Sequence, residues 1–294
     1  MSRSPKLHLF SVHDRGRGCL LAGAAVLIWL ALFPAARAES PAGRGAEPTS
    51  DAAALPDAPQ PQSGDPSEAN PGDRKQVTLR GTPVRILKDE AGILTSPARL
   101  HGSDYAVLVG LALATTVTVT ADHQIMSSSK LNDTSLNNHA VTASNGLMGA
   151  FVAAPAVIYG LGYIHHDDDA TETGILGGEA MVDGLVIEEA MKLVSMRERP
   201  TVDGAKGKFF QTGVGFGSSF PSTHSVIAWS SAAVIASEYP SIWTQVGAYG
   251  LATGVSVARV VGRQHFPSDV LVGSAVGWLV GRYVFRRHSR YWDE

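Results

Sequence analysis

The sequence predicts an all-α protein built as a six-helix bundle. Its apolar segments are rich in Ala, Gly, Leu and Val and run well beyond ten residues, which favours helices over strands. Polar loops join them, as in helical bundles. With 44% hydrophobic and 17% charged residues, the chain has ample material for a core. The formal net charge of -3 gives no indication of a nucleic-acid partner.

Residues 1–38 have the three parts of a secretory signal peptide. A basic start precedes an apolar run from Cys19 to Phe33, and Ala36-Arg37-Ala38 offers a cleavage site. The run is short for a membrane-spanning helix, although an uncleaved anchor is the alternative. We therefore expect an exported protein, in the periplasm or cell envelope on the outer face of the membrane. Cys19 is the only cysteine, so the remaining chain has no disulfide and no thiol nucleophile.

Residues 39–76 predict a disordered linker. Seven of the 16 prolines fall within residues 39–75, among Ala, Gly, Ser and Asp. Such a composition buries too little apolar surface to offset the entropy of ordering.

The folded domain is expected over residues 77–287. Residues 77–94 predict an extended piece followed by a short amphipathic helix. The six bundle helices are expected at 104–121, 145–163, 174–196, 223–238, 242–259 and 268–286. The 16-residue segment 223–238 is short for a span, and 174–196 carries five charged residues that would be costly inside a bilayer. We therefore favour a soluble or membrane-apposed domain.

Three short stretches combine residues that suit phosphate chemistry. They are Lys192 with Arg199-Pro200, Pro221-Ser222-Thr223-His224, and Arg259 with His265 and Asp269. Lysine and arginine bind phosphate oxygens, and Ser222 precedes a predicted helix whose first N–H groups favour anions. Asp269 lies four residues after His265, a spacing that lets its carboxylate reach and orient the imidazole. A nucleophilic histidine, an acid such as His224 and several cations describe phosphoryl transfer without a metal.

These motifs resemble the type 2 phosphatidic acid phosphatase (PAP2) and vanadium haloperoxidase superfamily, whose signature is K-x6-RP, PSGH and SR-x5-H-x3-D. The resemblance implies an all-α bundle and a phosphohistidine intermediate. By motif position it implies that His265 is the nucleophile, Asp269 its partner and His224 the general acid. It assigns the phosphate to Lys192, Arg199, Ser222, Arg259 and the backbone N–H of Thr223.

The sequence departs from that signature at three positions. Thr223 replaces the usual Gly and adds a hydroxyl near the phosphate, and Ala258 replaces the Ser before the arginine. Arg263 stands where a Gly is common, two residues before the second histidine. Its side chain is expected either in solvent or at the pocket rim.

Two further segments have competing interpretations. His165-His166-Asp167-Asp168-Asp169 resembles a metal cluster, but acids before a helix predicted near Thr173 favour a polar loop. The loop Phe209–Phe220 is either a lid or lipid-facing lip, or a plain connection.

The leading functional prediction is a metal-independent phosphatase that hydrolyses phosphomonoesters or lipid and prenyl (pyro)phosphates, needs no cofactor and acts at a membrane surface. One alternative is a vanadate-dependent haloperoxidase, because vanadate mimics phosphate. The other is a non-catalytic envelope protein with a relict phosphate site.

Overall fold

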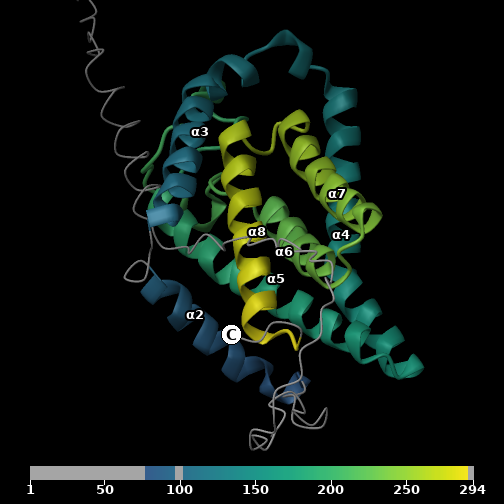
Figure 1. Cartoon of the computed structure of the whole chain (residues 1–294). Helices are drawn as coiled ribbons and strands as arrows, with labels where there is room; N and C mark the ends of the chain where they lie inside the picture. The colour runs from purple at the N-terminus through teal and green to yellow at the C-terminus, as the bar shows by residue number, and fades with distance from the viewer. Residues whose placement is uncertain (1–76, 97–101, 291–294) are drawn as a thin grey trace, which may run out of the picture. The chain divides into compact units, whose positions relative to one another are not determined.

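The computed structural model describes residues 77–96 and 102–290. The predicted signal peptide and linker lie outside these residues. The described residues form helices joined by loops and contain no strand, which confirms the all-α prediction. Its α-helices are α2 (Thr82–Thr95), α3 (Gly102–Met126), α4 (Thr134–His165), α5 (Asp168–Ser195), α6 (Thr223–Glu238), α7 (Ile242–Val261) and α8 (Pro267–His288) (Figure 1).

The described residues contain seven α-helices, one more than the predicted bundle of six. The helix outside the predicted six is α2, which corresponds to the short amphipathic helix expected within residues 77–94. It follows a 3-10 turn at Leu79–Gly81, where an extended piece was expected. Helix α4 begins eleven residues earlier than predicted, because Asp133 caps it by accepting the N–H groups of Ser135 and Leu136. Polar residues fill its first turns, so an apolar run could not mark this beginning.

Helices α6 and α8 form the centre of the core and pack closely along their length (Figure 1). Gly273, Gly277 and Gly281 recur every fourth residue and present one face of α8 to α6. A Cβ atom at Gly273 would lie 2.8 Å from the Ser222 carbonyl oxygen, and the other two glycines approach the α6 backbone as closely. We call this face the glycine seam. It brings the N-terminal ends of both helices together.

Helix α2 is fastened to the bundle by ion pairs. The Arg85 Nε atom lies 3.0 Å from the buried Glu179 carboxylate on α5. The buried Asp89 carboxylate accepts from His288 Nε2 at 2.7 Å and lies 3.3 Å from Arg287 Nε, both near the end of α8. Charge pairing therefore holds both ends of the described chain on the same bundle.

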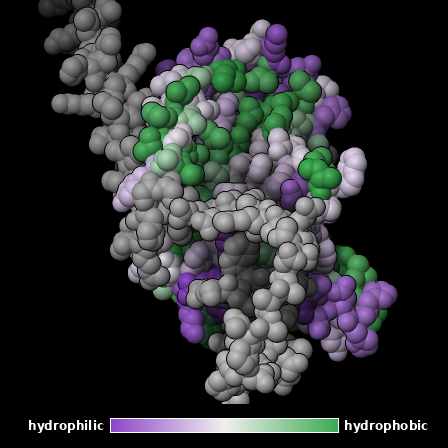
Figure 2. Space-filling model, in the orientation of Figure 1, coloured by the Kyte–Doolittle hydropathy of each residue, from purple (hydrophilic) through white to green (hydrophobic). Residues whose placement is uncertain are grey.

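Helices α3 and α4 leave most of their apolar side chains exposed. The segments Tyr105–Met126 and Thr134–His165 are long and apolar enough to cross a membrane. Only 22% and 17% of their most apolar windows are buried. Apolar surface gathers over the part of the molecule where α3, α4 and α7 lie (Figure 2). Of the described helices, only these two meet the length and composition of a span, fewer than the six weighed from the sequence.

Candidate active site

The three sequence motifs meet at one end of the bundle. Lys192 lies in the last turn of α5, and Arg199 follows in the loop. Ser222 is the N-cap of α6, and Arg259 lies in the last turn of α7. Asp269 lies in the first turn of α8, where its carboxylate accepts the Phe266 N–H at 2.8 Å and so caps the helix.

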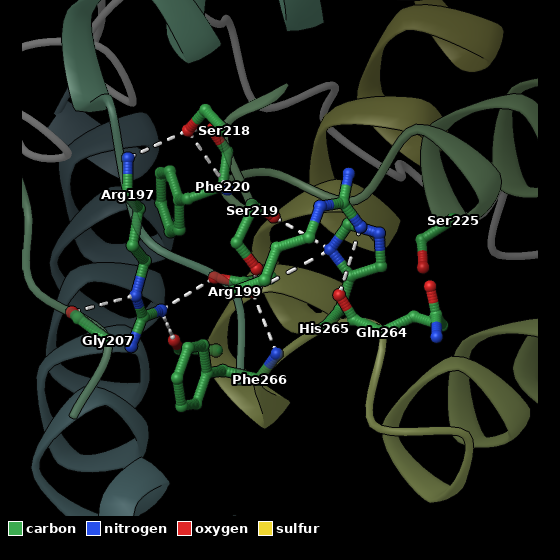
Figure 3. Close-up of polar contacts among 12 residues, drawn as sticks. Arg197, Arg199, Gly207, Ser218, Ser219, Phe220, Ser225, Gln264, His265 and Phe266 are labelled. Atoms are coloured by element: carbon green, nitrogen blue, oxygen red, sulfur yellow. Dashed lines mark hydrogen bonds and ion pairs between the residues drawn. The ribbon is translucent and has the colours of Figure 1, made fainter. Parts of the chain in front are cut away.

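His265 is buried, with 2% of its surface exposed. Its Nδ1 atom lies 2.7 Å from the Ser219 carbonyl oxygen (Figure 3). Because a carbonyl oxygen only accepts hydrogen bonds, Nδ1 carries the proton and Nε2 keeps its lone pair. Burial lowers the pKa of His265, and the nearby Arg199 and Arg259 add to this effect. The ring is therefore neutral with one free basic nitrogen, as a nucleophile requires.

Asp269 lies beside His265, as predicted, but is not the closest partner of its ring. The distance from Asp269 Oδ2 to His265 Nδ1 is 3.7 Å, a Coulombic contact longer than a hydrogen bond. The same oxygen accepts from Ser219 Oγ at 2.5 Å. Ser219 thus touches the carboxylate with its hydroxyl and the imidazole with its carbonyl, and orients the ring where the sequence suggested Asp269 alone.

Arg197 is a buried part of the site that the motifs did not indicate. Its Nη1 atom lies 2.6 Å from Asp269 Oδ1, and its Nη2 atom lies 2.7 Å from Asp122 Oδ2 on α3. Its Nε–H donates to the Gly207 carbonyl, and its guanidinium stacks on the ring of Phe266 at 4.1 Å (Figure 3). Burial by itself would raise the pKa of Asp269, but Arg197, the adjacent His265 ring and the hydrogen bond from Ser219 outweigh it and lower that pKa.

His224 and Arg259 share a contact with Asn145 on α4. The Asn145 Oδ1 atom lies 3.0 Å from His224 Nε2 and 3.2 Å from Arg259 Nη1. Desolvation, and then the positive charge of Arg259 and its neighbours, lowers the pKa of His224 to about 4. His224 is therefore neutral near pH 7. Asn145 belongs to none of the three motifs and directly follows other polar residues of α4, so nothing in the sequence set it apart.

Lys192 is held by acids as well as by the motif residue Thr223. Its Nζ atom lies 2.7 Å from Glu188 Oε1, 3.0 Å from Glu189 Oε1 and 2.8 Å from Thr223 Oγ1. The Thr223 hydroxyl donates to Glu188 Oε1 at 2.7 Å. The hydroxyl that Thr223 adds in place of the usual glycine is therefore already hydrogen-bonded to Lys192 and Glu188.

Two donors in the site have no partner among the described residues, namely the buried Ser222 Oγ and Arg259 Nε atoms. Arg199 donates Nε–H to the Gly217 carbonyl at 3.2 Å. It also donates Nη1–H to the Gln264 carbonyl at 3.2 Å (Figure 3). These donors lie beside three cations and the N-terminus of α6. Such an arrangement can bind an anion that has several oxygens, such as phosphate.

The segment His165-His166-Asp167-Asp168-Asp169 lies at the opposite end of α5 from Lys192. Asp167 caps α5, which begins at Asp168 and not near Thr173, by accepting the N–H groups of Asp169 and Ala170. Over the described residues, no group of three or more His, Cys, Asp or Glu side chains is arranged to hold a metal ion.

Arg263 lies in neither expected place. Its Nη1 atom donates to the Met126 carbonyl at 2.7 Å and to Asn132 Oδ1 at 2.9 Å. Its φ of 54° lies in the left-handed region. Glycine adopts this conformation most readily, which gives a physical reason for the glycine usual at this position.

The loop Phe209–Phe220 divides between core and surface. Phe220 is buried, and the Phe209 ring lies 4.5 Å from the Arg197 guanidinium. Phe216 is two-thirds exposed, at 67%. The loop is therefore fixed at both ends and open at its tip.

The family model of the PAP2 superfamily matches residues 174–293. This segment holds all three motifs and the site that they build. The match covers less than half of the chain and supports a PAP2-type domain over these residues. Over 65 residues the chain is 42% identical to a lipid A 1-phosphatase of Porphyromonas gingivalis. That match covers 21% of this chain and only 15% of the relative's length.

Among solved structures, the chain is similar to a transmembrane PAP2-type phosphatidylglycerolphosphate phosphatase from Bacillus subtilis. The sequence identity is 20%, and the TM-score is 0.40. The comparison covers 70% of this chain and 92% of that one.

Proposed function

We propose that this PAP2 protein is a phosphatase that hydrolyses phosphomonoesters on lipids through a phosphohistidine, without a metal ion. The observation that carries the proposal is the neutral, buried His265, whose free Nε2 accompanies unpartnered donors on Ser222 and Arg259. The family match of residues 174–293 supports the same reaction class.

In the first step, His265 Nε2 attacks phosphorus in line with the leaving oxygen. The N–P bond forms while the P–O bond to the alcohol breaks, and Arg199, Arg259 and Lys192 neutralise charge on the equatorial oxygens. The departing alkoxide takes a proton from His224. His224 can supply this proton once the substrate is bound, because a phosphate dianion raises the pKa of a neighbouring imidazole above the value of about 4 set by desolvation and Arg259.

In the second step, water attacks the phosphohistidine. His224, now neutral, takes a proton from the water as the O–P bond forms and the N–P bond breaks. Inorganic phosphate leaves, and His265 returns to its neutral state. The proton on Nδ1 remains at the Ser219 carbonyl throughout, so the positive charge that develops on the ring lies near Asp269.

A lipid substrate is favoured by the surface beside the site. Asn145 connects the site to α4, whose other exposed side chains include Val152, Val157 and Leu161. An apolar face of this kind suits contact with acyl chains. The curated relative, by its name, removes phosphate from lipid A. We propose membrane association through α3 and α4, with the site on the outer face of the membrane.

The test uses the full chain in detergent micelles with a panel of phosphoesters, with and without a chelator. The panel contains a phosphatidic acid, a prenyl diphosphate and a soluble phosphomonoester. We expect phosphate release that survives the chelator, is greatest on the lipid monoester and disappears in His265→Ala. Acid quenching should trap phosphate bound to the wild type, but not to His265→Ala. Equal activity in that variant, or loss of activity with the chelator, contradicts the mechanism.

A further inference from the structure

Glu188 forms a cluster with Lys192 and Thr223 but has no role in the phosphoryl-transfer mechanism. The Glu188 side chain is fully buried and ion-paired to Lys192. Thr223 Oγ1 accepts from Lys192 and donates to Glu188, which closes a three-membered ring of polar contacts. Glu188 Oε2 has no partner in the described part of the chain.

This ring places a negative charge directly behind a cation that the mechanism assigns to phosphate. The cations of the pocket are Lys192, Arg199 and Arg259, whereas Arg197 is already committed to Asp122 and Asp269. A carboxylate 2.7 Å from Lys192 Nζ lowers the positive charge that an incoming anion meets. It also occupies part of the hydrogen-bonding capacity of the ammonium group.

We propose that Glu188 competes with the substrate for Lys192 and thereby limits the anionic charge that the pocket accepts, so that a single phosphate is preferred over a diphosphate. This inference rests on the proposed function of the same site. Thr223 is the positioning residue of the device, because its hydroxyl fixes both charged groups. Thr223, which replaces the usual glycine, then connects Glu188 to the N-terminal end of α6, where phosphate binds.

The ionisation of Glu188 makes the device sensitive to pH. Burial, as the largest cause, raises its pKa to about 7, although Lys192 and the Thr223 hydrogen bond lower it. On α5 the charged groups near Glu188 are Lys192 and Glu189, while His224 of α6, Arg259 of α7 and Arg199 of the loop act on the same pocket. Above about pH 7 the carboxylate competes for Lys192, and below it the neutral acid leaves the ammonium to the ligand.

The test measures sulfate binding by calorimetry between pH 5.5 and 8.5, with full-length protein in detergent. Sulfate remains a dianion over this range, so a change in affinity reports the protein. For the wild type we expect the affinity for sulfate to fall about tenfold as pH rises. This factor corresponds to a change of about one unit in the pKa of Glu188 when sulfate binds. Glu188→Gln should bind sulfate about tenfold more tightly than the wild type at pH 8.5, with only the smaller pH dependence that protonation of His224 contributes. Parallel pH curves for the two proteins overturn the proposal.

Glu189→Gln is the matched control, because Glu189 also contacts Lys192 but its side chain is 38% exposed. Water screens that contact, so the variant should shift sulfate affinity less than twofold. Thr223→Val provides a second test if Glu188→Gln fails to fold, since it removes only the hydroxyl that connects the pair. We expect it to flatten the pH dependence. An unchanged pH dependence in Thr223→Val contradicts the role of the ring.

The specificity arm compares a prenyl monophosphate with its diphosphate. The ratio of kcat/KM for diphosphate over monophosphate should rise at least fivefold in Glu188→Gln, and an unchanged ratio counts against the inference. Sulfate binding needs no turnover and can be repeated in His265→Ala. A protein that binds sulfate as expected but hydrolyses nothing refutes the proposed function and leaves the role of Glu188 in anion binding supported.

Discussion

Replacement of Arg197 by methionine tests whether buried charge holds the active site together. The guanidinium makes ion pairs to Asp122 and Asp269, donates to Gly207 and Ser268, and has 1% of its surface exposed. Methionine fills similar volume but leaves two buried carboxylates without their cation. Breaking a buried pair in this way costs about 3–5 kcal/mol. Domains are stable by only about 5–15 kcal/mol, so the variant should lose a large part of its stability.

The assay is urea unfolding followed by circular dichroism, together with kcat in the absence of urea. Arg197→Met should lower both, because Asp269 loses the charge that keeps it ionised near His265. Asp122→Asn added to this variant should recover part of the stability by removing one uncompensated carboxylate. Arg80→Met on the exposed 3-10 turn is the control and should change stability by less than about 0.5 kcal/mol. A free energy of unfolding equal to that of the wild type in Arg197→Met would refute this reasoning.

Three further predictions concern separate parts of the molecule. Asn145→Ala should lower kcat about tenfold with a smaller change in KM, because the variant misplaces His224 without removing it, and loss of a general acid costs more than tenfold. The acidic limb of the pH–rate profile should also shift. An unchanged profile means that Asn145 does not orient His224. Burial raises the pKa of Asp183 from 3.8 to about 8, so the folded state retains this proton and stability should fall as pH rises through this interval. Asp183→Asn should remove up to about 1.4 kcal/mol per pH unit of that slope, and a slope identical to that of the wild type in thermal unfolding counts against the assignment. Arg263→Gly should be about 1 kcal/mol more stable than Arg263→Ala, because both lose the side-chain contacts but only glycine relieves the φ of 54°; equal stabilities would mean that the backbone is not strained.

The sequence predicted those parts of the fold in which a long apolar run coincides with a helix. The prediction for 223–238 matches α6, and α7 and α8 extend one or two residues beyond their apolar runs. The beginning of α4 was missed because its first turns are polar and depend on the Asp133 cap. Hydrophobic periodicity identifies faces that a helix buries, and it carries little information about a solvated end.

The sequence indicated which motif residues come together in the candidate site, and it did not indicate the contacts that join distant segments. Asp122 reaches Arg197 across 75 positions of sequence, and Asn145 reaches His224 across 79. Nothing in the spacing of single residues on α3 and α4 indicates which neighbour they will meet. The partner of the His265 ring was likewise assigned to a side chain, because a backbone carbonyl such as that of Ser219 has no signature in a sequence.

The glycine seam makes the separation of the two proposed catalytic histidines a property of the helix pair that carries them. His224 lies in the first turn of α6, and His265 lies two residues before α8. A larger side chain between these helices should therefore change the distance between the two histidines. Gly281 lies twelve residues beyond Asp269, about 18 Å along an ideal helix. Substitutions should therefore be tolerated on the outward faces of α4 and α7. At Gly273, Gly277 and Gly281 of α8 they should lower activity, although the last of these lies far from the site. Redesign of the substrate range can change residues at the rim of the pocket and keep the glycine seam unchanged.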